Sequence, residues 1–204
     1  MEAAEHERIS ADEFLEWVSG QEGRFELVDG YVVEMMAGAK QGHNVVVTNI
    51  VASVGPQAKS GGCRTTSSDT AVQTLASTIR YPDIVVDCGP PDPDATVAEN
   101  PTLVVEVSSP GTSLVDTTDK LDEYQRHPAV RLIMLVEPSI VSVKLYRRDE
   151  RGLWDSEKYD DLDGVIDMPE IGAVLSMSEI YDTLTPRHRP RLQLIETADV
   201  PRPR

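Results

Sequence analysis

Cysteine is scarce in this chain, and no cysteine pattern typical of a metal site is present. The 204 residues include only two cysteines, Cys63 and Cys88, and neither belongs to a CxxC or Cys/His array. The sequence therefore argues against a structural zinc site. A disulfide between the two cysteines stays open, although a chain of this length can bury a sizeable core without one.

Basic residues and long apolar runs are also in short supply. Lys and Arg number 19 against 35 Asp and Glu, which gives a formal net charge of −16. This charge opposes non-specific association with nucleic acid or anionic membranes, but it excludes neither a local basic groove nor anion binding through a metal. The N-terminus lacks the apolar core of a signal peptide, and no apolar stretch is as long as a membrane span. We therefore expect a soluble cytoplasmic protein without a membrane partner.

The first half of the chain carries clear local signals for short elements. Ser10 and Glu13 have the spacing of a capping box, and Asp29-Gly30 is a strong tight-turn signal between two β-prone runs. Apolar residues recur at helical spacing up to Gly55-Pro56, where we expect the helix to stop. The pattern predicts a helix over 10–20, a hairpin over 24–35, a helix over 43–54 and strands over 64–67 and 70–75.

The second half predicts a sheet that is covered on both faces. The runs at 84–86 and 101–107 are apolar at nearly every position, and an acidic, proline-rich loop separates them. After them the pattern predicts a helix over 113–127, strands over 130–138 and 141–148, a hairpin over 154–168 and a helix over 177–184. This order indicates an α/β or α+β fold with a mixed central sheet flanked by helices. We expect one domain over 1–185 and a proline-rich, locally basic arm over 186–204.

Each of the two apolar runs has a carboxylate at its edge. Asp83 precedes the first run and Glu106 directly follows the apolar stretch of the second, so the two would lie side by side if the strands pair. Carboxylate oxygens are the ligands that Mg²⁺ uses in proteins, together with waters and phosphates. A metal held there could polarise a phosphodiester and activate water. Lys120, on the following predicted helix, could orient the water or neutralise charge that develops on the phosphate.

These residues resemble a known group of nucleases. The segments "YPDIVV" and "PTLVVEVSSPGTSLVDTTDKLDEYQ" are similar to the PD-(D/E)xK superfamily, which has a restriction-endonuclease-like fold, and more narrowly to the Uma-two family of restriction endonucleases. That family also carries an early hairpin motif, here "FELVDG", and a histidine that opens the next helix, here His43. The resemblance extends from the first helix to about Arg147.

The resemblance implies a role for each matching residue. The proline-aspartate of the signature falls on Pro82 and Asp83, and the second acid falls on Glu106. The superfamily's lysine normally lies two residues after that acid, where this chain has Ser108. In the Uma-two pattern the lysine moves to the following helix, which implies Lys120. Glu26 matches a further acidic position and is predicted to complete the metal site, while His43 is a candidate phosphate contact.

Each candidate also has a structural interpretation that needs no ligand. Asp83 could hold a turn after proline, and Lys120 could pair with Asp116 on a solvated helix face. Glu26 could belong to the polar face of a hairpin, and His43 could cap its helix or fill a boundary position. Glu106 is the sharpest case, because carboxylates are rarely buried unless they are paired or bound to metal. A serine hydrolase is disfavoured, because no G-x-S-x-G elbow surrounds the serines after Glu106.

The sequence as a whole predicts an Mg²⁺- or Mn²⁺-dependent endonuclease that hydrolyses phosphodiester bonds of nucleic acid, with DNA preferred. Asp83, Glu106 and Lys120 would be catalytic, and the metal ligands would be Glu26, Asp83 and Glu106. The alternative is a non-catalytic binding or assembly protein that keeps a nuclease-like fold, which the acidic balance favours. A toxin or transposition-related nuclease with a basic partner is a third hypothesis. The resemblance admits a homodimer but leaves the oligomeric state open.

Overall fold

The computed structural model describes residues 7–35, 38–109 and 114–188, apart from the side chains of 114–116. The helices are α1 Ala11–Val18, α2 Gln41–Ser60, α3 Leu114–Arg126 and α4 Met177–Ile180. The strands are β1 Phe25–Val28, β2 Tyr31–Glu34, β3 Arg64–Ser67, β4 Val72–Leu75, β5 Thr78–Arg80, β6 Ile84–Asp87, β7 Pro101–Val107, β8 Leu132–Glu137, β9 Ser142–Arg148, β10 Trp154–Tyr159, β11 Val165–Met168 and β12 Ala173–Ser176. A single 3₁₀ turn spans Pro169–Ile171.

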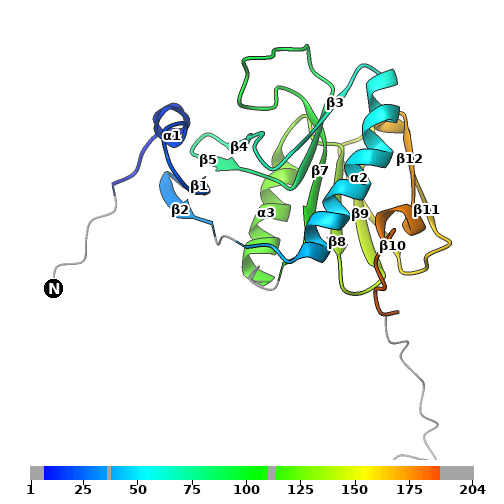
Figure 1. The fold of residues 1–204 in the computed structure, drawn as a ribbon. Coiled ribbons are helices and arrows are strands. Elements are labelled where there is room, and N and C mark those ends of the chain that lie inside the picture. Colours follow the sequence, from blue (N-terminus) through cyan, green and yellow to red (C-terminus); the bar gives the residue numbers. More distant parts are fainter. Residues whose placement is uncertain (1–6, 36–37, 110–113, 189–204) are drawn as a thin grey trace, which may run out of the picture.

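A six-stranded mixed sheet forms the centre of the molecule, in the order β10-β9-β8-β7-β6-β3 (Figure 1). Only β7 and β8 run parallel, and helix α3 lies in the crossover between them. Leu103 and Val105 pack into the core under α2, whereas Val104 packs with Tyr124 of α3 on the opposite face. The predicted mixed sheet with helices on both faces is therefore confirmed.

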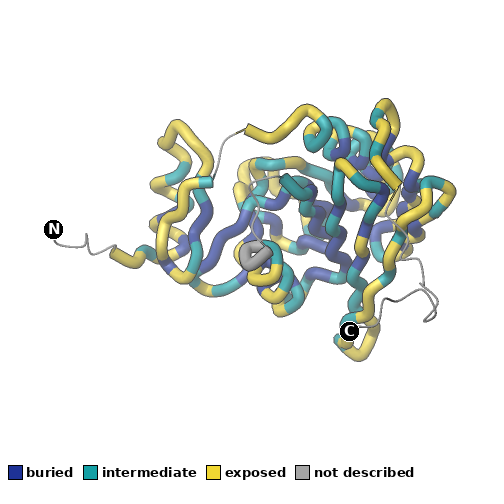
Figure 2. Tube along the Cα trace, turned by 90° about the horizontal axis from the view of Figure 1, so that it is seen from below, coloured by how far each residue is buried: buried dark blue, intermediate teal, exposed yellow. Residues whose placement is uncertain are grey.

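A second, smaller sheet was not predicted. It has the order β2-β1-β5-β4 and is antiparallel throughout. Together with α1 it encloses a separate core that includes Phe14, Leu27 and Ile79. This unit lies to one side of the six-stranded sheet in Figure 1. Its outer strand β2 is exposed at all four positions, whereas β7 of the large sheet is buried at six of its seven positions. Figure 2 shows the buried segments in the interior of the molecule and the exposed ones at its periphery.

Two local signals of the first half, the capping box and the tight turn, are borne out. The Ser10 hydroxyl accepts a hydrogen bond from the Glu13 amide at 3.3 Å, and the Glu13 carboxylate accepts one from the Ser10 amide at 2.8 Å. This capping box begins α1. Asp29 and Gly30 form the β1–β2 turn with φ values of 51° and 85°, as a tight hairpin turn requires.

The predicted end of α2 is wrong, because the helix continues through Gly55 and Pro56 to its end at Ser60. Tertiary contacts hold the segment after the proline in helical form. Ala58 is fully buried in the core under the large sheet. The Gln57 amide also exchanges two hydrogen bonds, of 2.8 and 2.9 Å, with the backbone of Val174 in β12. These contacts offset the loss of one helical hydrogen bond at proline.

The predicted hairpin over 154–168 is also wrong, because its two halves belong to different sheets. Strand β10 pairs with β9 along its whole length and forms an edge of the central sheet. Strand β11 pairs with β12 instead, and this hairpin packs with α4 against the α2 side of the core. Both predicted strands exist, but their partners lie elsewhere in the chain.

The two cysteines are joined by a disulfide. Cys63 precedes β3 and Cys88 follows β6, so they continue the antiparallel register that pairs Arg64 with Asp87. No helix within the described ranges is long and apolar enough to span a membrane. In the predicted arm, Arg187 pairs with Ile140, and residues 189–204 lie outside the described part of the chain.

Candidate functional site

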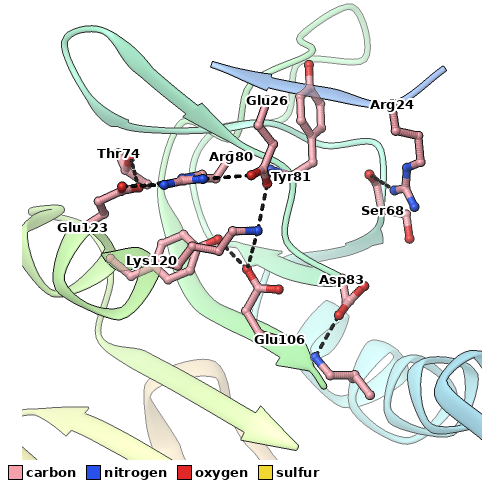
Figure 3. Close-up of polar contacts among 12 residues, drawn as sticks. Arg24, Glu26, Ser68, Thr74, Arg80, Tyr81, Asp83, Glu106, Lys120 and Glu123 are labelled. Atoms are coloured by element: carbon pink, nitrogen blue, oxygen red, sulfur yellow. Dashed lines mark hydrogen bonds and ion pairs between the residues drawn. The ribbon is translucent and has the colours of Figure 1, made fainter. Parts of the chain in front are cut away.

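Asp83 and Glu106 lie at the same end of two paired strands. Strands β6 and β7 run antiparallel with Ile84 opposite Val105, so the residue before Ile84 faces the residue after Val105. The Asp83 Oδ2 atom accepts a hydrogen bond from the backbone amide of Val107 at 2.8 Å (Figure 3). The side chains are 17% and 21% exposed, respectively. The adjacent placement that the sequence predicted is present, and the ligand role of the two acids stays a prediction.

Lys120 reaches this pair from α3. Its Nζ atom lies 2.9 Å from Oε1 of Glu26 and 3.9 Å from Oε1 of Glu106 (Figure 3). The residue is only 8% exposed, so the interpretation of Lys120 as part of a solvated helix face is wrong. The side chain of Asp116, its supposed surface partner, is outside the described part of the structure.

Glu26 is buried and accepts hydrogen bonds at both carboxylate oxygens. Oε1 accepts from Lys120 and, at 3.2 Å, from the backbone amide of Tyr81. Oε2 accepts from Nη1 of Arg80 at 2.9 Å. Since the residue is 4% exposed, it is no part of a solvated hairpin face. Figure 3 shows Glu26 between Arg80 and Lys120.

Arg80 and Glu123 are members of this group that the sequence analysis missed. The Arg80 guanidinium binds both carboxylate oxygens of Glu123, at 2.6 and 2.8 Å, and Thr74 donates a further hydrogen bond to Glu123 at 3.0 Å. Burial alone would lower the pKa of Arg80, but the hydrogen bonds and charges of Glu123 and Glu26 outweigh it and raise the pKa. We call Glu26, Arg80, Lys120 and Glu123 the anchor cluster.

The sequence contained two signals for the missed residues. Arg80 interrupts an otherwise apolar and β-prone stretch shortly before Pro82, and a charge within a buried strand needs a partner. Glu123 follows Lys120 by three residues and therefore lies on the same face of α3.

Glu106 occupies an environment that disfavours its charged form. The Tyr124 hydroxyl donates a hydrogen bond of 2.7 Å to Oε1 of Glu106. Burial raises the pKa of Glu106 to about 7; Lys120 and the Tyr124 hydrogen bond act in the opposite direction, and Asp83 and Glu26 add to the rise. Burial together with the nearby Glu106 also raises the pKa of Tyr124 well above its usual value.

His43 contacts Asp83 from the first turn of α2. Its Nε2 atom lies 3.1 Å from Oδ1 of Asp83, and this hydrogen bond raises the pKa of His43 against the opposing effect of burial. Lys40 occupies the N-cap position of α2, so the interpretation of His43 as the cap is wrong. A contact between His43 and a substrate phosphate stays a prediction.

The donor set suits a small divalent cation held partly by water. The anchor cluster contains two carboxylates and two basic side chains, so its charges nearly cancel. Asp83 and Glu106 then remain as adjacent acids whose repulsion a cation would relieve. Over residues 7–35, 38–109 and 114–188, no three His, Cys, Asp or Glu side chains converge to hold a metal ion. Mg²⁺ commonly uses one or two carboxylates and keeps several waters, so two acids are sufficient.

The mixed sheet with these acids at its strand ends defines a restriction-endonuclease-like protein. The fold is similar to the crystal structure of a putative nuclease of the DUF820 family from Anabaena variabilis, with a TM-score of 0.68. That comparison covers 85% of this chain and 97% of the other at 19% sequence identity, so it shows the fold alone.

Sequence comparison identifies the family. Residues 11–178 match Uma2, which is described as "Putative restriction endonuclease", and the chain therefore belongs to the Uma2 family. The chain is also 30% identical over 177 residues to the uncharacterized protein slr1290 of Synechocystis sp.. That match covers 85% of this chain and 92% of its relative.

Proposed function

We propose that this protein is an Mg²⁺- or Mn²⁺-dependent endonuclease that hydrolyses phosphodiester bonds of nucleic acid, with DNA as the preferred substrate. The observation that carries the proposal is the placement of Asp83 and Glu106 on paired strands with the Lys120 ammonium 3.9 Å from Glu106. Membership of a family described as restriction endonucleases supports it.

The roles of the residues follow from their contacts. Asp83 and Glu106 would hold the cation, which when bound supplies a Lewis acid for the phosphodiester and its attacking water. His43 and the Val107 amide each bind one oxygen of Asp83 and so fix its orientation. Tyr124 fixes Glu106 in the same way. The Lys120 ammonium lies where it can stabilise negative charge that develops on the phosphate.

The test is single-turnover cleavage of a DNA duplex with Mn²⁺, beside calorimetric measurement of Mn²⁺ binding. We expect Glu106→Gln to lose both metal binding and cleavage. Lys120→Met should cut about a hundredfold more slowly, as when other preorganised electrostatic groups are removed, and should still bind the metal. Glu150→Gln, at an exposed position beyond β9, is the matched control and should behave as the wild type. A wild type that binds no metal and cuts no nucleic acid would refute the proposal.

A non-catalytic role is the second candidate, because a formal net charge of −16 disfavours a nucleic-acid partner. In that case the protein would bind Mn²⁺ through Asp83 and Glu106 and still leave every nucleic acid intact. The homodimer and the cytoplasmic location stay predictions. Sedimentation of the protein with and without DNA tests the homodimer.

A further inference from the structure

Glu26 does not have the surroundings of a metal ligand. Its two carboxylate oxygens accept three hydrogen bonds, from Arg80, Lys120 and the Tyr81 amide. Two of these donors are cations, which repel a third positive charge placed beside the same carboxylate. A metal ion at Glu26 would compete with the ammonium and the guanidinium for the same carboxylate, on which the three hydrogen bonds leave at most one acceptor site open.

The position of Glu26 in the fold supports the same conclusion. Glu26 comes from β1 of the small sheet, whereas Asp83 and Glu106 come from neighbouring positions on the large sheet. Among the residues that the structure describes, no cluster of three potential ligands forms, so Glu26 does not complete a three-ligand site with the other two acids.

What Glu26 does is to hold Lys120. A lysine side chain has four rotatable bonds, and fixing it costs rotamer entropy. The hydrogen bond of 2.9 Å to Glu26 fixes the ammonium, and the same ammonium lies 3.9 Å from Glu106. Arg80 in turn binds Glu26 and is held by both oxygens of Glu123, which fixes the carboxylate as well.

We propose that Glu26 is the positioning residue for Lys120 and that Arg80 and Glu123 fix Glu26 for this purpose. This role replaces the metal-ligand role that the sequence predicted for Glu26. The proposal rests on the proposed function, since it assigns Lys120 to the phosphate and the metal to Asp83 and Glu106.

The decisive variant is the double substitution Glu26→Gln/Lys120→Met, because it removes one negative and one positive charge together. If Glu26 only positions Lys120, the double variant loses no ligand and also loses the cation nearest to Glu106. Its dissociation constant for Mn²⁺, measured by calorimetry, should then equal that of the wild type or be lower. Glu106→Gln, at a proposed metal ligand, is the matched control and should weaken binding at least tenfold. A double variant that binds Mn²⁺ more than threefold weaker than the wild type would overturn the proposal.

Cleavage supplies a second readout. Because Glu26 acts through Lys120, the single-turnover rate of the double variant should equal that of Lys120→Met within about threefold, in line with the non-additivity of residues that act as a unit. Affinity for uncut DNA should stay unchanged in both. A double variant at least tenfold slower than Lys120→Met would show an independent role for Glu26 and overturn the proposal.

The two proposals fail in different ways. If the wild type does not bind Mn²⁺, both the proposed function and this inference are refuted. If the wild type binds Mn²⁺ and the double variant binds it more than threefold weaker, only the inference is refuted. If the double variant does not fold, Glu26→Gln/Lys120→Gln has the same charge change, keeps hydrogen-bonding groups at both positions and answers the same question.

Discussion

The raised pKa of Glu106 should make the metal-free protein less stable at high pH. The pKa of its carboxyl is raised to about 7, mainly by burial, from the usual value of 4.5. Between these two values the unfolded chain releases the proton and the folded protein keeps it, so stability falls as the pH rises. The contribution of the Glu106 carboxyl to the free energy of unfolding is complete below pH 4.5 and is lost as the pH rises through about 7. The total loss is at most about 3 kcal/mol.

Glu106→Gln should remove this dependence. The free energy of unfolding of the variant relative to the wild type should therefore be higher at pH 8 than at pH 5, by up to about 3 kcal/mol. Urea titrations of both proteins at the two pH values, with a chelator present, measure the difference. An equal difference at both pH values would contradict the raised pKa.

Tyr124 should influence metal binding without touching the metal. Its hydroxyl donates to Glu106 at 2.7 Å and opposes the rise in the pKa of that carboxyl. Tyr124→Phe removes the donor and keeps the ring, so a proton should compete better with the metal. We expect Mn²⁺ affinity at pH 7 to fall about tenfold, the lower end of such effects around metal sites. At pH 9 the two proteins should differ much less, and an equal loss at both pH values would contradict this explanation.

At the residue scale, the sequence located the acids, the lysine and two of their partners, Glu26 and His43, but not Arg80, Glu123 or Tyr124. Asp83, Glu106 and Lys120 stand out because polar residues beside apolar runs are visible in a linear pattern. Arg80 was missed because its partners lie 43 and 54 residues away along the chain. Only the pairing of β5 with β1, and the packing of α3, bring these charges together.

At the scale of elements, the sequence correctly predicted the features that depend on residues close together in the chain. The capping box and the Asp-Gly turn depend on neighbours within three residues, and both were correct. The predictions that were wrong concern features that depend on contacts with residues distant in sequence. The end of α2 depends on β12, and β10 pairs with β9 rather than with β11. Hydrophobic spacing identifies a strand but does not identify its partner.

The disulfide should stabilise the edge of the large sheet and leave the site unchanged. It closes a segment with a sequence separation of 25 between Cys63 and Cys88. A loop of this length is worth about 2–3.5 kcal/mol through the entropy of the unfolded chain. Cys63→Ala/Cys88→Ala should lower the free energy of unfolding by this amount, as measured with guanidinium. Mn²⁺ affinity should stay the same, because Asp83 lies at the opposite end of β6; a changed affinity would show that the bond positions the site.

For the molecule as a whole, the acidic charge constrains how a nucleic acid can bind. With 19 Lys and Arg against 35 Asp and Glu, the net charge of −16 opposes the approach of a polyanion. We expect DNA binding to require Mn²⁺ and to depend only weakly on salt, with a log–log slope of about −1 to −2. Fluorescence anisotropy of labelled DNA between 50 and 200 mM salt, roughly the range over which such slopes are defined, measures it. A slope near −6 would reveal that many basic side chains contact the phosphates and would contradict this expectation.

The proposed metal binding and the proposed cleavage depend on different sheets of the molecule. Glu106 belongs to the large sheet and Asp83 directly precedes its strand β6, whereas Glu26 and Arg80 belong to the small sheet, which has its own core. Such units commonly open independently and at lower free energy than the whole protein unfolds. Opening of the small sheet would leave both acids in place and release the ammonium from its acceptor. If the proposed function holds, the protein is therefore expected to pass on gentle heating through a state that binds Mn²⁺ but no longer cleaves DNA.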